Sequence, residues 1–85
     1  MNLPYLVLTL HKILKYTEDE KFLVFSSSLL SLTHLAEGLQ LANVAFLEYT
    51  SEYSPAQRRM NISQFHNIPV YRVFLMELKH GARGL

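Results

Sequence analysis

The chain has 85 residues, of which 49% are hydrophobic, and a formal net charge of +1. This length allows one small domain or a piece of a larger one, and the composition excludes an intrinsically disordered chain. Because the sequence has no cysteine, a disulfide framework and a thiolate metal site are also excluded. The eight basic residues are scattered, so any contact with nucleic acid is expected to be local.

Neither a membrane span nor a secretory signal is expected. The first apolar stretch, residues 3–10, is followed by His11 and Lys12 and is far shorter than the roughly 20 residues that cross a bilayer. A secretory signal needs positive charge before its apolar run, whereas here the lysines follow it. The four histidines have no HExxH or other ligand spacing, so no metal site is predicted.

The first predicted element is a helix over residues 3–16, with Asn2 as its cap and Pro4 in its first turn. Its apolar residues recur at helical spacing, at Leu3, Leu6, Val7, Leu10 and Leu14. An acidic turn follows at residues 17–20, and residues 22–25 form a continuous apolar run that predicts a central parallel strand.

Three serines at residues 26–28 follow this strand and supply the cap of a second helix. The helical spacing directs Leu32, Leu35, Ala36 and Leu39 inward and Thr33, Glu37 and Gln40 outward. Asn43 breaks the pattern, and residues 44–47 predict the next strand, which closes with Glu48 and Tyr49.

A third helix is predicted from the capping box at residues 54–57 to about His66. Its inward stripe is Ile62 and Phe65, and Arg58 shares this apolar face, whereas Arg59 lies on another face.

The last third of the chain predicts a buried strand that leads into a basic, glycine-bearing loop. Residues 73–76 are a short, continuous apolar run, and residues 77–84 contain Lys79, Arg83 and two glycines. In open α/β sheets, ligands bind beyond the carboxyl ends of the strands. This edge of the sheet, where residues 26–28 and 49–53 also lie, is therefore the predicted functional site.

The alternation of helices and strands predicts an α/β fold in three layers, with a short parallel sheet of about three strands flanked by helices. Three strands leave two apolar edges unpaired, so we expect a truncated domain that folds weakly alone.

Three segments resemble successive motifs in the second RecA-like lobe of the Swi/Snf-type DNA-dependent ATPases, a branch of helicase superfamily two. They are KFLVFSS at residues 21–27, SPAQRRMNISQFHN at residues 54–67 and VFLMELKHGARGL at residues 73–85. The first resembles motif four, although Ser27 replaces its usual glutamine. Gln57, Arg58 and Phe65 match the Gln-Arg pair and the phenylalanine seven residues after that arginine.

The last segment resembles motif five, with Lys79 on its basic position, Gly81 and Gly84 on two of its three glycines and Leu85 on its hydrophobic residue. It departs from the motif in three ways: Glu77 stands where serine is usual, Ala82 replaces the middle glycine, and the usual asparagine does not follow Leu85.

The resemblance implies that residues 1–85 are an incomplete helicase C-terminal domain, ending after motif five, of a nuclear ATP-dependent DNA translocase in chromatin remodelling or DNA repair. It implies nucleic-acid contacts by Ser26, Ser27, Arg58 and Lys79, and a nucleotide-cleft loop at Gly81 and Gly84. The intact parent would use ATP and magnesium, double-stranded DNA and the first ATPase lobe of the same polypeptide. This chain lacks GxxxxGK[ST], so alone it is expected to bind no cofactor and to hydrolyse no ATP.

Two other functions remain open at this stage. One is a small stand-alone α/β interaction or regulatory domain without catalysis. The other is the corresponding lobe of an RNA helicase, although the Lys-x-Gly-x-x-Gly-Leu ending favours the DNA-translocating branch over the RNA helicases. Single residues also have structural alternatives: residues 26–28 can cap a helix, Arg58 can form an ion pair with Glu52 or with a missing segment, and Lys79 can be a solvated charge.

Overall fold

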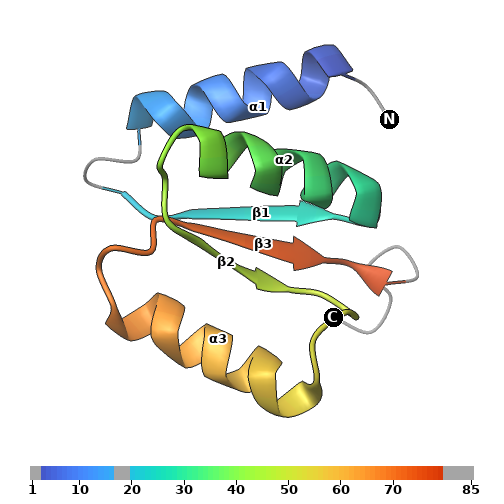
Figure 1. The fold of residues 1–85 in the computed structure, drawn as a ribbon, viewed down its shortest axis with the longest axis vertical. Coiled ribbons are helices and arrows are strands. Elements are labelled where there is room, and N and C mark those ends of the chain that lie inside the picture. The colour runs from blue at the N-terminus through green and yellow to red at the C-terminus, as the bar shows by residue number, and fades with distance from the viewer. Residues whose placement is uncertain (1–2, 17–19, 80–85) are drawn as a thin grey trace.

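The computed structural model describes residues 3–16 and 20–79, which alternate between helices and strands (Figure 1). In chain order the elements are α1 (Leu3–Tyr16), β1 (Phe22–Ser26), α2 (Leu29–Leu41), β2 (Phe46–Tyr49), α3 (Pro55–Asn67) and β3 (Val73–Glu77). The strands form one parallel sheet in the order β1-β3-β2, with α1 and α2 on one face and α3 on the other. The predicted α/β class and three-layer arrangement are confirmed.

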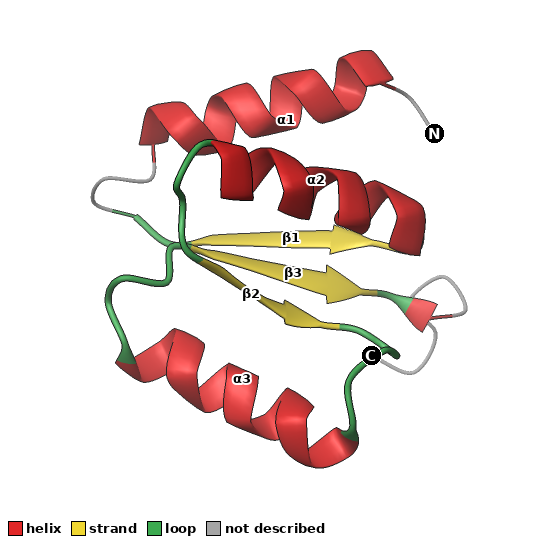
Figure 2. Cartoon of the chain, in the orientation of Figure 1, coloured by secondary structure: helices red, strands yellow, loops and turns green. Residues whose placement is uncertain are grey.

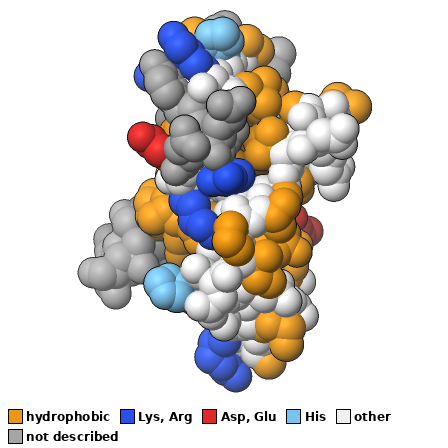
Figure 3. Space-filling view, turned by 90° about the vertical axis from the view of Figure 1, so that its left-hand side faces the viewer, with side chains coloured by type: hydrophobic (Ala, Val, Ile, Leu, Met, Phe, Trp, Pro, Cys, Tyr) orange, Lys and Arg blue, Asp and Glu red, His pale blue; other side chains and the backbone are white. Residues whose placement is uncertain are grey.

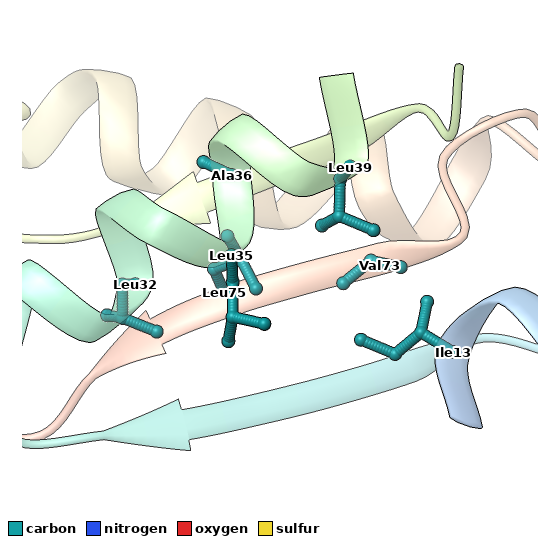
Figure 4. Packing of buried hydrophobic residues seen from close by; sticks show 7 residues of the cluster. All are labelled: Ile13, Leu32, Leu35, Ala36, Leu39, Val73 and Leu75. Carbon is teal, nitrogen blue, oxygen red and sulfur yellow. The ribbon is translucent and has the colours of Figure 1, made fainter. Parts of the chain in front are cut away.

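The last strand, β3, is the central strand and is buried on both faces, as its apolar run predicts. Val73 and Leu75 point toward α2, where they pack in one cluster with side chains from α1 and α2 (Figure 4). Phe74 points the other way and stacks on Phe65 of α3, with ring centroids 4.9 Å apart. The inward face predicted for α2 is also confirmed, because Leu32, Leu35, Ala36 and Leu39 are all buried.

The first strand, β1, is an edge strand, so the prediction of a central strand is wrong for the described residues. Its side chains alternate: Phe22 and Val24 pack against the core, whereas Leu23 and Phe25 are 54% and 51% exposed. Because α3 lies over β2 and β3, nothing among the described residues covers the second face of β1. In β1, unlike in β3, a continuous apolar run thus belongs to a strand that the described helices cover on one face only.

Helix α1 contacts the core through Ile13, which is buried, and through Leu10. The predicted stripe is partly wrong, because Val7 and Leu14 are exposed, while the side chains of Leu3 and Leu6 and all of Asn2 lie outside the described residues. The inward face of α1 differs from the predicted one because α1 and α2 approach each other closely at Gly38. A Cβ atom there would lie 2.8 Å from Leu10 Cδ2, so the absence of a side chain fixes which face of α1 turns inward.

The predicted serine caps of α2 and α3 are confirmed, whereas the predicted cap of α1, Asn2, lies outside the described residues. Ser28 Oγ accepts a hydrogen bond from the Ser31 N–H at 3.2 Å at the start of α2, and Ser54 Oγ accepts from the Gln57 N–H at 3.1 Å at the start of α3. After α2, Asn43 has a φ of 59°, in the left-handed region that asparagine tolerates, which ends the helix as predicted. The chain straightens only beyond this turn, so β2 begins later than the predicted residue 44.

Helix α3 faces the sheet with a polar side chain that the apolar pattern did not predict. Asn61 is only 3% exposed, and its Nδ2 donates to the Glu48 carbonyl at 2.8 Å, whereas the predicted inward residue Ile62 is 45% exposed. The prediction for Ile62 is therefore wrong. Asn61, the residue before it, faces the sheet instead, because its side chain donates to the Glu48 carbonyl of β2. Phe65 is half-buried on Phe74, as predicted.

Candidate nucleic-acid interface

The segments after β1, β2 and β3 meet at the carboxyl edge of the sheet, the predicted site (Figure 2). Two hydrogen bonds join them. The Leu78 N–H donates to the Ser26 carbonyl at 2.8 Å, and the Ser51 N–H donates to Glu77 Oε1 at 2.8 Å. The end of β3 is thus bonded to the end of β1 on one side and to the loop after β2 on the other, so the three strand ends form one surface.

The two serines predicted as nucleic-acid contacts differ in what their side chains do. The Ser26 hydroxyl is half-buried, accepts from the Ser28 N–H at 3.0 Å and donates to the Ser28 carbonyl at 3.4 Å. These bonds fix the turn between β1 and α2. Ser27, between them in the chain, is exposed at the edge. Of the pair, Ser27 is the one whose hydroxyl can meet a ligand without breaking this turn.

Arg58 sits beside the loop that joins β2 to α3 and is half-buried. Its Nη1 donates to the Thr50 carbonyl at 3.3 Å, and its guanidinium carbon lies 5.6 Å from the centroid of the Tyr49 ring. These contacts hold the loop against α3 by a charge-assisted hydrogen bond and a cation–π contact. The ion pair with Glu52 suggested for Arg58 is not among its described contacts, which are a carbonyl and a ring.

Glu77 carries one negative charge of this surface, and the exposed Glu52 in the loop after β2 carries another. The hydrogen bond from the Ser51 N–H holds the pKa of the Glu77 carboxyl below its usual value, and the positive charges of Lys79 and Arg58 add to the effect. Glu77 stands where the resembled motif has a serine, and its carboxylate accepts a hydrogen bond from Ser51 in the loop after β2. Lys79 follows it and is exposed. Its charge faces solvent at the edge, close enough to Glu77 to affect its titration.

A polar network supports the surface from behind, and the sequence analysis missed it. Gln57 Nε2 donates to Asn61 Oδ1 at 2.8 Å, and the Tyr53 hydroxyl donates to Glu48 Oε1 at 3.0 Å. Burial raises the pKa of the Tyr53 hydroxyl, and its bond to the Glu48 carboxylate raises it further. The signal in the sequence was the spacing of Gln57 and Asn61, which places two amides on one face of α3.

The remaining predicted residues cannot be placed. Gly81 and Gly84, the predicted nucleotide-cleft loop, lie outside the described residues, as do the changed position Ala82 and Leu85. In residues 3–16 and 20–79, no group of three or more His, Asp or Glu side chains could hold a metal ion. Within the same residues, no helix is long and apolar enough to span a membrane.

Comparison with known proteins adds no relative. No protein-family model matches the chain, and no curated protein matches it.

Proposed function

We propose that this chain is part of the second ATPase lobe of a Swi/Snf-type ATP-dependent DNA translocase that acts in the nucleus in chromatin remodelling or DNA repair. In the intact protein it contributes contacts to DNA and to the nucleotide cleft, and by itself it is inactive. The observation that carries the proposal is the joining of three loops at the carboxyl edge, where Glu77 and Ser26 are each bonded to a neighbouring segment.

This arrangement suits the recognition of a phosphate backbone. Lys79 and the Ser27 hydroxyl are exposed there, and lysine and serine are both common partners of phosphate oxygens. The Glu77 carboxylate repels an approaching phosphate. The hydrogen bond from Ser51 and the positive charges of Lys79 and Arg58 partly compensate its negative charge. We assign the direct contacts to Lys79 and Ser27, whereas Ser26 and Arg58 act as positioning residues that shape the loops.

The ATP chemistry belongs to the rest of the protein in this proposal. The sequence contains no GxxxxGK[ST] motif, so ATP and magnesium would be held by the first ATPase lobe of the same polypeptide. None of the residues described at the carboxyl edge forms a phosphate-binding loop. The role of this chain is to bind and orient DNA beside the cleft, and no step of hydrolysis is assigned to its residues.

The proposal is tested by the affinity of the intact protein for double-stranded DNA at several salt concentrations. Removing one phosphate contact lowers the slope of log K against log salt by about 0.9 for duplex DNA, so we expect Lys79→Ala to lower the slope by about this amount. Lys12→Ala is the matched control, because it removes the same exposed charge from α1, away from the edge. Equal slopes for Lys79→Ala and the wild type would contradict the proposal.

A further inference from the structure

The loop after β2 presents a backbone N–H group whose acceptor lies outside the loop. Thr50 is buried and accepts from the other two amides of this turn: its Oγ1 from the Glu52 N–H at 3.2 Å, and its carbonyl from the Tyr53 N–H at 3.1 Å. The Ser51 N–H instead points to the end of β3, where Glu77 Oε1 accepts it at 2.8 Å. Because the buried Thr50 anchors the turn, the direction of the Ser51 N–H is fixed before any ligand arrives.

Two positive side chains stand near the carboxylate that accepts this bond. The hydrogen bond from the Ser51 N–H is the largest cause that lowers the pKa of the Glu77 carboxyl, and the charges of Lys79 and Arg58 lower it further. Backbone N–H groups, lysine and arginine are also the donors that proteins commonly offer to phosphate oxygens. The Glu77 carboxylate therefore lies among groups that suit a phosphate equally well.

The formal charges around Ser51 depend on Glu77. Lys79 and Arg58 are positive, while Glu77 and the exposed Glu52 are negative, so the charges of these side chains balance. Without the Glu77 carboxylate, positive charge would exceed negative charge around the Ser51 N–H. An external anion would then meet both a free hydrogen-bond donor and an attractive potential.

The amino edge of the sheet also has positive side chains, but they are arranged differently. Figure 3 views this edge and shows Lys, Arg and His side chains among hydrophobic ones. Lys21 Nζ donates to the carbonyls of Phe65 and Ile68, the latter at 3.1 Å, so its charge is used at the C-terminal end of α3. The backbone thus offers acceptors to Lys21, whereas at the carboxyl edge it offers the Ser51 donor. A donor of this kind favours an anion at the carboxyl edge.

We infer that the Ser51 N–H, Lys79 and Arg58 form a binding site for one phosphate group, and that the Glu77 carboxylate occupies this site until a phosphate displaces it. Glu77 is thus an internal competitor of the ligand. Its bond to Ser51 lies at the surface, where an anion from solvent can reach it. Arg58 already donates from Nη1 to the Thr50 carbonyl, so it contributes to the site through its charge.

The inference rests on the proposed function for the source of the phosphate, which would be the backbone of double-stranded DNA. A phosphate group free in solution has the same chemistry, so the two sources are tested separately. If the bond between Glu77 and Ser51 served only to hold the loop, its removal would weaken the protein without strengthening the binding of any anion. A gain of binding after the loss of Glu77 therefore separates competition from a purely structural role.

The first test is the affinity of the intact protein for duplex DNA. Glu77→Ala removes the carboxylate and frees the Ser51 N–H. Glu52→Ala is the matched control, because it removes the same charge from the same surface and leaves the Ser51 bond in place. A hydrogen bond to a charged group is worth about tenfold in affinity, so we expect Glu77→Ala to bind DNA about tenfold more tightly than Glu52→Ala. Should Glu77→Ala not fold, Glu77→Gln keeps an acceptor for Ser51 and should still bind more tightly than Glu52→Gln.

The second test needs no DNA and reads one amide. Hydrogen exchange at Ser51 is measured in the intact protein with inorganic phosphate and with sodium chloride at the same ionic strength. In chloride we expect exchange about tenfold faster in Glu77→Ala than in the wild type, because the amide has lost its acceptor. Phosphate, or duplex DNA, should slow it again in Glu77→Ala, whereas Glu52→Ala should behave as the wild type throughout.

The outcomes separate this inference from the proposed function. Exchange at Ser51 that stays fast in Glu77→Ala with both phosphate and DNA would overturn the inference, even if the DNA affinity rises. Slowing by phosphate, together with equal DNA affinities of Glu77→Ala and Glu52→Ala, would retain the site but assign it to a free phosphate group. If neither the wild type nor any variant binds DNA while phosphate still slows exchange, the proposed function fails and the phosphate site stands.

Discussion

Asn61→Ala removes the side chain that connects α3 to the edge of β2. Asn61 is 3% exposed, and the change leaves the Glu48 carbonyl without its donor at 2.8 Å. An unpaired buried acceptor costs about 1–3 kcal/mol. Alanine has a higher helix propensity than asparagine, which stabilises the helix by a few tenths of a kcal/mol and by at most about 0.7 kcal/mol. We therefore expect the free energy of unfolding to fall by about 0.3–2.7 kcal/mol, the difference between these two ranges.

Urea unfolding followed by circular dichroism measures this loss. With a slope of about 2 kcal/mol/M, in the range that is typical of small proteins, the midpoint should fall by roughly 0.2–1.4 M. Ser63→Ala, at an exposed position of the same helix, is the control and should shift the midpoint much less. Gln57→Ala removes the other partner of Asn61, so the two changes together should cost less than their sum. A midpoint for Asn61→Ala at or above the wild-type value would refute the reasoning.

Three further changes test other contacts. The folded pKa of Glu77 lies below its unfolded value of 4.5, so its carboxylate stabilises the fold above that pH and the contribution is lost as the pH falls through the folded pKa. Calorimetry should therefore find Glu77→Gln less stable than the wild type at neutral pH and equal to it in strong acid; a difference that persists in acid would be contrary evidence. Gly38→Leu should cost about 1–3 kcal/mol in thermal unfolding by overpacking Leu10, and Leu10→Ala in the same chain should restore part of it, whereas strictly additive losses would count against the contact. Ser54→Ala should cost about 1 kcal/mol in urea unfolding and speed amide exchange in the first turn of α3, and unchanged exchange there would argue against the cap.

The order of elements and the burial of β3 on both faces could be predicted because local signals agree with the fold, whereas the central position expected for residues 22–25 belongs to β3. Ser28 and Ser54 cap their helices in any tertiary context, and the run at residues 73–76 is apolar on both sides because both faces of β3 are covered. The meeting of the segments after β1, β2 and β3 followed from the same reasoning, since the carboxyl ends of parallel strands share one edge.

Tertiary contacts decided the features that the sequence did not predict. The inward face of α1 depends on the close approach of Leu10 to Gly38, which the spacing within α1 does not contain. The polar contact of Asn61 depends on a carbonyl 13 residues away in the chain. At the site, Glu77 was read as a departure from a motif, whereas its bond to the Ser51 N–H could be found only with β2 and β3 side by side.

ATP hydrolysis by the intact protein, with and without double-stranded DNA, tests the central claim most directly. We expect hydrolysis that DNA stimulates, and we expect Lys79→Ala to weaken the stimulation while hydrolysis without DNA stays near the wild-type rate. Lys12→Ala should behave as the wild type. Hydrolysis that DNA does not change, or an intact protein that hydrolyses no ATP, would contradict the assignment of this chain to a DNA-dependent ATPase.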